Sequence, residues 1–186
     1  PTLYAGICLS INDSVKYQLA NAEVQESEVT VVATEEPAPE EIIPSETKEV
    51  PFYEGYTGKK VFEKGNLITG WTPGKLQKMA ITDENGFRKY DDRYLVALGT
   101  YFTTVTGQYF DLVLENGTII PCILGDQKSD YHTDTTYHAF TIGSKDCSEF
   151  IVDMQLLSKE VRQAGDVSKT FEEWDSPVKE VILYEK

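Results

Sequence analysis

A predicted β-hairpin constrains the fold of this chain more than any other feature of its sequence. Two apolar runs, residues 109–114 and 118–124, flank the pair Asn116 and Gly117. An Asn-Gly pair between such runs is a strong hairpin signal, because both residues readily adopt the positive φ angles of a tight turn. The second run leads directly into a polar loop. A rigid hairpin is therefore expected to carry that loop to the rim of a β domain.

The loop after the hairpin, residues 125–134, contains Asp126, Asp130, His132 and Asp134. Asp and Thr favour turns because their side chains bond nearby backbone groups, so one interpretation is a solvated turn. The other is a catalytic site, since crowded carboxylates raise one another's pKa and one of them can stay protonated near neutral pH. A protonated carboxyl group can donate a proton in catalysis. Spacing alone favours neither interpretation.

Short apolar runs and glycine-rich turns predict a mainly β domain. Residues 93–98, 149–153 and 178–184 are apolar enough to form further strands. Two short helices are expected, one at residues 72–80, which open with Thr and Pro, and one at residues 154–163, which end before a glycine. Short strands with one or two small helices indicate a compact, predominantly β barrel.

The acidic residues are concentrated in one segment. The formal net charge is −14, and residues 23–49 alone contribute −8, with nine acidic residues and one lysine. Residues 22–51 also contain four prolines, so they are predicted to be an acidic, disordered linker that precedes a β-barrel domain at residues 52–186. The other residues carry −14 + 8 = −6 and no basic stripe. Nucleic acid is therefore not an expected partner.

The N-terminal segment, residues 1–21, is apolar at its start but lacks a basic region before the apolar residues. Its apolar part is shorter than the ~20 residues that cross a membrane. We interpret it as a possible remnant of an export or anchor sequence. The expected location is thus extracellular or in the cell envelope, with membrane contact only through an anchor missing from this sequence.

The chain has three cysteines, Cys8, Cys122 and Cys147, which are too few and too widely spaced for a disulfide scaffold or a zinc ribbon. Cys122 and Cys147 lie in or beside predicted strands, so a disulfide between them is one alternative. Burial as small apolar side chains is the favoured one. No cofactor is expected.

The order of these features resembles a known family. A strand ending in Val96-Ala97-Leu98, then Gly99 and Thr100, precedes a hairpin whose second strand opens on an Asp loop. This order resembles the three-aspartate domain of bacterial cell-wall proteins and is similar to the catalytic domain of membrane-bound lytic transglycosylase A. The resemblance spans about residues 94–153. It implies a small, six-stranded double-psi β-barrel and cleavage of peptidoglycan glycan strands. Separately from the resemblance, we expect the protein to be a monomer.

The sequence departs from the family pattern at two points. Ala97 stands where the family usually has proline ahead of Leu-Gly-Thr, and residues 127–129 read Gln-Lys-Ser in place of Thr-Gly-Gly. By position after the strand, Asp126 matches the first aspartate of the family. A later aspartate is matched by Asp134, with Asp130 as a competing match.

The resemblance implies roles for the residues of the loop. Asp126 would be the general acid and base, giving a proton to the leaving oxygen and then helping the muramyl 6-hydroxyl to attack the anomeric carbon. Asp130 and Asp134 would complete the catalytic set by raising its pKa or stabilising positive charge on the sugar. The candidate substrate-binding residues are His132, Thr133 and Lys128.

Two alternatives remain open from the sequence. Asp126, Asp130, His132, Asp134 and His138 could supply oxygen and imidazole ligands to a metal ion, although their spacing matches no standard calcium or zinc motif. The protein could instead be a non-catalytic β module, secreted or associated with a phage, that binds wall polymers or another protein through the same rim.

Overall fold

The computed structural model describes residues 42–62 and 72–185. These residues belong to one compact unit. The predicted N-terminal segment 1–21 and the first part of the predicted linker, residues 22–41, lie outside the described residues. No helix among the described residues combines the length and the apolar character needed to cross a bilayer.

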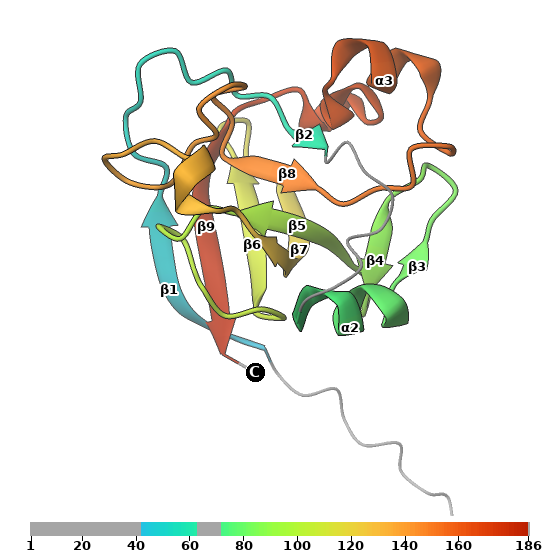
Figure 1. Cartoon of the computed structure of the whole chain (residues 1–186), viewed down its shortest axis with the longest axis horizontal. Coiled ribbons are helices and arrows are strands. Elements are labelled where there is room, and N and C mark those ends of the chain that lie inside the picture. Colours follow the sequence, from blue (N-terminus) through green and yellow to red (C-terminus); the bar gives the residue numbers. More distant parts are fainter. Residues whose placement is uncertain (1–41, 63–71, 186) are drawn as a thin grey trace, which may run out of the picture. The chain divides into compact units, whose positions relative to one another are not determined.

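In the part of the chain that the structure describes, nine strands form one mixed sheet (Figure 1). The strands are β1 (Ile43–Glu49), β2 (Val61–Phe62), β3 (Ile81–Thr82), β4 (Arg88–Tyr90), β5 (Arg93–Leu98), β6 (Tyr109–Leu114), β7 (Ile119–Gln127), β8 (Ser148–Phe150) and β9 (Val178–Glu185). Their order is β1-β9-β6-β7-β5-β4-β3, and β8 branches from β5 to pair with β2. Among the described residues, no pairing joins the two ends of this order.

The predicted hairpin is confirmed. Strands β6 and β7 pair antiparallel from Tyr109 opposite Ile123 to Val113 opposite Ile119. Gly117 has a φ of 88°, which explains why the turn needs glycine there. Strand β7 ends three residues later than predicted, because it continues through Gly125 to Gln127, where it pairs with β5.

Within the described residues, two short α-helices, α2 (Thr72–Met79) and α3 (Lys159–Ala164), cover parts of the sheet's margin (Figure 1). Both helices were predicted, although α3 is shorter than the expected 154–163. The side chain of Ser158 caps its first turn by accepting a hydrogen bond from the Val161 N–H, and Gly165 ends the helix with a φ of 64°. Three 3-10 turns, η1 (Asp130–His132), η2 (Val167–Lys169) and η3 (Glu172–Trp174), complete the set.

The core consists of two clusters of buried apolar side chains, to which several strands contribute. Leu98, Phe110, Leu124 and Phe150 are fully buried in one cluster. Cys122 and Cys147 are also buried in it as free thiols, which confirms burial rather than a disulfide. The sheet alternation explains this arrangement, because every second residue of a strand faces the same side.

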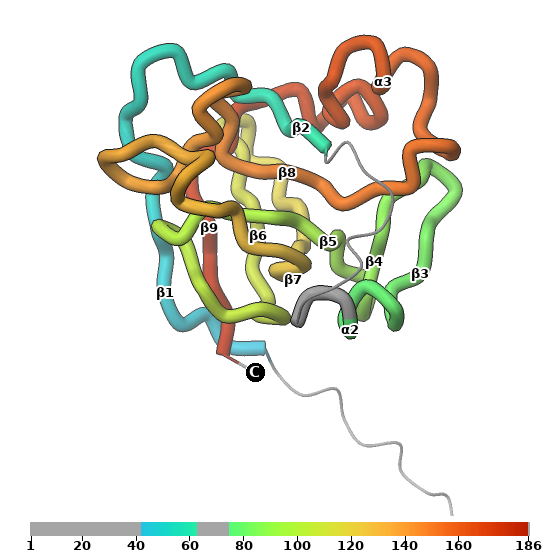
Figure 2. The backbone as a smooth tube through the Cα atoms, viewed as in Figure 1, coloured from blue at the N-terminus to red at the C-terminus, as the bar shows by residue number. Residues whose placement is uncertain are grey.

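Segments that are distant in sequence run side by side above the core. The stretch before β2 lies against the loop between η1 and β8 (Figure 2). The Thr57 N–H donates a hydrogen bond to the Lys145 carbonyl over 3.1 Å, and the Thr57 hydroxyl donates to the Ser144 carbonyl. Strand β2 then pairs with β8 in parallel.

The predicted mainly β fold with two short helices is confirmed, but two expectations change. The sheet has nine strands rather than six. The prediction of a disordered linker up to residue 51 is wrong for Ile43–Glu49, which forms β1 and pairs with β9. The backbone hydrogen bonds of this edge pairing form regardless of side-chain polarity, which is why an acidic composition did not reveal the strand.

Candidate functional site

Two carboxylates flank Ala97 on the strands to either side of β5. Ala97 lies opposite Asp126 in the parallel β5–β7 pair and opposite Glu149 in the antiparallel β5–β8 pair. Residues opposite each other on adjacent strands project from the same face of a sheet, so both carboxylates stand beside the small Ala97 side chain. Because strands are about 4.8 Å apart, the Cα atoms of Asp126 and Glu149 are roughly 10 Å apart.

A β-bulge at Gly125 sets the direction of Asp126. Val96 pairs with Leu124 and the next residue, Ala97, pairs with Asp126, so Gly125 is the extra residue on β7. A Cβ atom at Gly125 would lie 2.7 Å from Ile151 Cδ1 and 2.9 Å from Leu95 Cβ. Glycine is therefore the residue that lets β7 pack closely here and still turn Asp126 to the site.

Asp126 and Glu149 line a cavity of about 240 Å³. All of its lining residues have polar side chains and come from the end of β7, the loop after it and β8: Asp126, Gln127, Lys128, Ser129, His132, Thr133, Thr141 and Glu149. Four of the six predicted site residues are in this set. The other two, Asp130 and Asp134, are not part of the lining.

Burial raises the pKa of the Glu149 carboxyl above its ordinary value. Lys128 opposes this effect, whereas the negative charges of Asp146 and Asp126 add to it, and His132 opposes it more weakly. Removal of a carboxylate from water disfavours its charged form, and a second carboxylate nearby does the same. Glu149 is therefore the lining carboxyl group that the structure favours as a proton donor.

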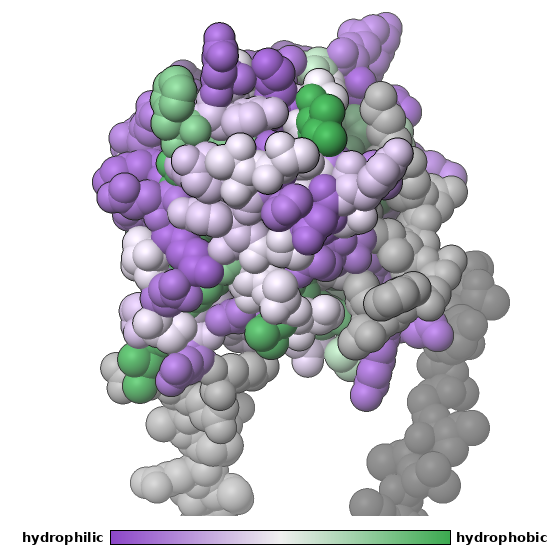
Figure 3. All heavy atoms as spheres, turned by 60° about the vertical axis from the view of Figure 1, so that its left-hand side comes forward, coloured by the Kyte–Doolittle hydropathy of each residue, from purple (hydrophilic) through white to green (hydrophobic). Residues whose placement is uncertain are grey.

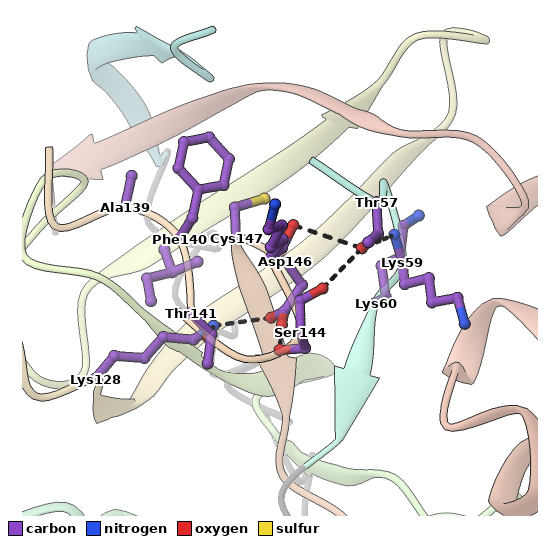
Figure 4. Close-up of polar contacts among 12 residues, drawn as sticks. Thr57, Lys59, Lys60, Lys128, Ala139, Phe140, Thr141, Ser144, Asp146 and Cys147 are labelled. Atoms are coloured by element: carbon purple, nitrogen blue, oxygen red, sulfur yellow. Dashed lines mark hydrogen bonds and ion pairs between the residues drawn. The ribbon is translucent and has the colours of Figure 1, made fainter. Parts of the chain in front are cut away.

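Lys128, which lines the cavity, belongs to a buried ion pair. The Lys128 Nζ lies 2.9 Å from Asp146 Oδ2, and the two side chains are only 4% and 0% exposed. Lys128 also donates to the Thr141 hydroxyl over 2.7 Å, and the Ser144 hydroxyl donates to Asp146 (Figure 4). Because each charge is paired and hydrogen-bonded, the pair holds the Lys128 side chain in one position beside the cavity.

Asp134 has a different role from the one predicted. It is 5% exposed, and its carboxylate accepts hydrogen bonds from four backbone N–H groups, those of Thr136, Tyr137, Ala139 and Phe140. Burial alone would raise its pKa, but these four hydrogen bonds outweigh burial and lower it. The expectation that crowding raises the pKa of the loop carboxylates therefore does not hold for Asp134, which clamps the 134–140 turn.

Asp130 lies before that turn, at the start of η1. Its carboxylate accepts a hydrogen bond from the Thr100 hydroxyl over 2.7 Å, and the nearest nitrogen of His138 is 3.9 Å away. The side chain is 53% exposed. Asp130 thus ties the loop to the residue after Gly99 and does not face the cavity.

Gly99 allows this contact between β5 and the loop. A Cβ atom at Gly99 would lie 1.9 Å from the His138 carbonyl oxygen, closer than any side chain can be placed. His138 has a φ of 57°, in the left-handed region. The two residues together bring the turn that Asp134 clamps against the end of β5, and that turn holds Thr133 at the cavity.

Sequence reasoning missed Glu149. It lies 23 positions after Asp126, and the sequence indicated only that it belongs to a strand. The two carboxylates are brought close because β7 and β8 both pair with β5, which the sequence does not reveal. One signal was present, since Glu149 is an acidic residue at the start of an apolar run, where a carboxylate is costly to bury.

For the metal alternative, the described ranges contain no group of three His, Cys, Asp or Glu residues placed to hold an ion.

The face that comes forward in Figure 3 is mainly hydrophilic or weakly polar, and its apolar residues form small separate groups. This pattern is ordinary for a protein surface. Comparison with models of known protein families, with curated proteins and with solved structures finds no match.

Proposed function

We propose that the protein cleaves the glycan strands of peptidoglycan at the cavity between β7 and β8, by a lytic transglycosylase-like reaction. The observation that carries the proposal is the pair of carboxylates, Asp126 and Glu149, on either side of Ala97. Glu149 has a raised pKa, as a general acid requires near neutral pH. The choice of peptidoglycan rests on the sequence resemblance to cell-wall proteins.

In the proposed reaction, protonated Glu149 donates to the oxygen of the leaving sugar. The Asp126 carboxylate stabilises the positive charge that develops on the anomeric carbon, as the second carboxylate does in glycosidases. Glu149, now ionised, then accepts the proton of the muramyl 6-hydroxyl while that oxygen attacks the anomeric carbon. The product carries an anhydro ring, and no water is consumed.

This assignment moves the acid from Asp126, where the resemblance placed it, to Glu149. Burial is the first cause of the raised Glu149 pKa, because it disfavours the charged carboxylate. Glu149 therefore keeps its proton to a higher pH, as a proton donor must. The backbone hydrogen bonds to Asp134 act in the opposite direction and keep it ionised. The remaining polar side chains of the lining, such as His132 and Thr133, are placed to bind sugar hydroxyls.

The cavity volume favours a small unit of the substrate inside it. About 240 Å³ is below the ~300–1,000 Å³ of typical ligand pockets, so it suits one ring of a longer chain rather than a whole oligosaccharide.

We also propose that the sheet curves into a double-psi β-barrel. The mixed pairing at β5, parallel to β7 and antiparallel to β8, supports this topology. The proposed site of action is the cell envelope or the extracellular space.

The proposal is tested by digestion of purified peptidoglycan and mass spectrometry of the released fragments. The wild-type protein is expected to release muropeptides that end in anhydro-muramic acid. Glu149→Gln and Asp126→Asn should release none, and Glu84→Gln, in an exposed turn, should match the wild type. Products with a reducing end instead of an anhydro ring would indicate hydrolysis and contradict the transglycosylase mechanism.

The same assay addresses the alternative of a non-catalytic module. If the wild type sediments with the wall but releases no fragment, the protein is a binding module and the catalytic proposal fails. If Asp126→Asn and Glu149→Gln retain full release, cleavage takes place elsewhere on the protein and this site assignment fails.

A further inference from the structure

A second cavity, of about 520 Å³, is separate from the proposed catalytic site. It is formed by the end of β1, the loop that follows it, the β6–β7 turn and the start of β9. In Figure 1, β1 and β9 lie side by side, and this cavity lies where the chain leaves β1. None of its lining residues lines the cavity of Asp126 and Glu149.

Three aromatic side chains line this cavity, namely Phe52, Tyr53 and Tyr56. Phe52 is 89% exposed, which is unusual for a large apolar side chain at the edge of a cavity. Tyr53 is held by stacking on Phe140, with ring centroids 4.6 Å apart and planes 8° apart. Tyr56 is fixed through its hydroxyl, which accepts a hydrogen bond from the Val178 N–H over 3.1 Å. Two of the three rings are therefore preorganised, and the third is open to solvent.

Two acidic side chains, Glu49 and Glu115, also line the cavity, and both residues are exposed. The one basic residue in the lining, Lys179, lies 3.8 Å from the carboxylate of Glu180, which is outside the lining. Within the described ranges, no ion pair involves Glu49 or Glu115. The cavity therefore combines aromatic rings with a negative charge balance.

Aromatic rings and carboxylates together favour one class of ligand. The face of an aromatic ring is negative and attracts a cation within about 6 Å, and this attraction is the basis of aromatic cages that bind alkylammonium groups. The rings also accept the aliphatic carbons of such a group, while the carboxylates neutralise its charge. An anion would be repelled by both acidic residues, and a purely apolar ligand would gain nothing from them.

We propose that this cavity is a binding site for an alkylammonium group, and specifically for the side chain of a lysine residue in a peptide. A lysine side chain matches the cavity in its two parts, because its methylene stem can lie on the rings while the ammonium meets Glu49 and Glu115. The site is separate from Asp126 and Glu149, so it does not depend on the proposed catalytic function.

The test is a titration of the isotope-labelled full chain, followed by NMR, with Nα-acetyl-lysine methylamide as the probe. Saturable shifts of residues around the cavity are expected in the millimolar range. The same compound with its ε-amine acetylated is the matched control ligand and should bind at least about tenfold more weakly, because it lacks the charge that the cage attracts. Choline forms a third arm that separates primary from quaternary ammonium groups.

Variants give the second part of the test. Phe52→Ala and Glu115→Gln should each weaken lysine binding by about threefold to tenfold. Both residues are exposed, so the variants are expected to fold. Ile119→Ala, an exposed apolar residue outside the lining, is the control and should bind like the wild type. The digestion of peptidoglycan by these variants should not change.

Four results would overturn the proposal: no saturable shift, equal binding of the acetylated compound, tighter binding of choline than of lysine, or unchanged binding by both Phe52→Ala and Glu115→Gln. These results are independent of peptidoglycan cleavage. A protein that binds lysine here but releases no muropeptide would contradict only the catalytic proposal.

Discussion

The strands beside β5 and the loop after β7 both carry carboxylates, but their surroundings differ. Asp134 in the loop is surrounded by backbone N–H groups, which stabilise its charge and lower its pKa. Glu149 on β8 is surrounded by protein that excludes water and by other carboxylates, which raise its pKa. Burial of an acidic group is therefore not informative by itself. Its hydrogen-bond donors decide whether it stabilises a turn or is available for proton transfer.

The largest expected effect is on catalysis, and it comes from the substitution of Glu149 on β8. Glu149→Gln should reduce the rate of glycan cleavage by about 10²–10⁴-fold, the usual contribution of a general acid. Cleavage rates at substrate saturation provide the measurement, with circular dichroism to confirm folding. A loss of less than tenfold would mean that Glu149, despite its raised pKa, does not transfer the proton.

The loop side of the comparison should show its effect in stability. Asp134→Ala removes the acceptor of four backbone N–H groups, so it should lower the free energy of unfolding by about 3 kcal/mol. Asp130→Ala, at an exposed carboxylate with one hydroxyl partner, should cost at most about 1 kcal/mol. Urea unfolding of both variants tests this difference. Equal losses would contradict the assignment of Asp134 as the clamp.

The bulge that orients Asp126 is expected to tolerate no side chain. Gly125→Ala should lower stability by about 1–3 kcal/mol, because the new Cβ meets Ile151 and Leu95. Gly143→Ala is the matched control, since a Cβ there has open space within 4 Å. Thermal unfolding of the two variants gives the measurement. A neutral Gly125→Ala would show that β7 can shift without harm, and that Asp126 is less precisely placed than the bulge indicates.

The smallest expected effect concerns the pH dependence of stability. A carboxyl group with a raised pKa in the folded protein makes folding less favourable once it ionises, so Glu149→Gln should stabilise the protein above about pH 4.3, the ordinary glutamate value. Below that pH the Glu149 carboxyl group is protonated in both the folded and the unfolded state, so the stabilisation by Glu149→Gln should vanish. Asp134 has the opposite effect, because its pKa is lowered in the folded protein. Its ionised carboxylate stabilises the fold at pH values above the ordinary aspartate pKa, and this stabilisation is lost as the pH falls through the pKa of the folded protein. Unfolding midpoints measured between pH 3 and pH 8 test both signs.

The local features of this fold were accessible from the sequence, and the long-range ones were not. The Asn116-Gly117 turn, strand β5 and both helices follow from short signals. The position of Asp126 beside a buried strand follows from the same hairpin. By contrast, β1 was missed because its residues are exposed and acidic, and only pairing with β9 makes them a strand.

The candidate site divides in the same way. Glu149 could not be connected to Asp126 without knowing that both strands pair with β5 at Ala97. The clamp at Asp134 left a local signal, because Asp followed by two threonines is a common turn pattern in which the carboxylate bonds the next N–H groups. That signal agrees with the backbone hydrogen bonds that Asp134 accepts, but the side chain is buried and not solvated.

The position of Ala97 between the two carboxylates has a consequence for how this architecture can change. Backbone hydrogen bonds to β5 fix the distance between β7 and β8. The distance between the two carboxyl groups therefore depends on the number of methylene groups in each side chain. Asp126→Glu would narrow that gap, and Glu149→Asp would widen it, by about one carbon–carbon bond without moving the scaffold. If the proposed cleavage of glycan strands takes place here, a wider gap would admit a water molecule between acid and sugar, and a single codon change would then turn the proposed ring closure into hydrolysis.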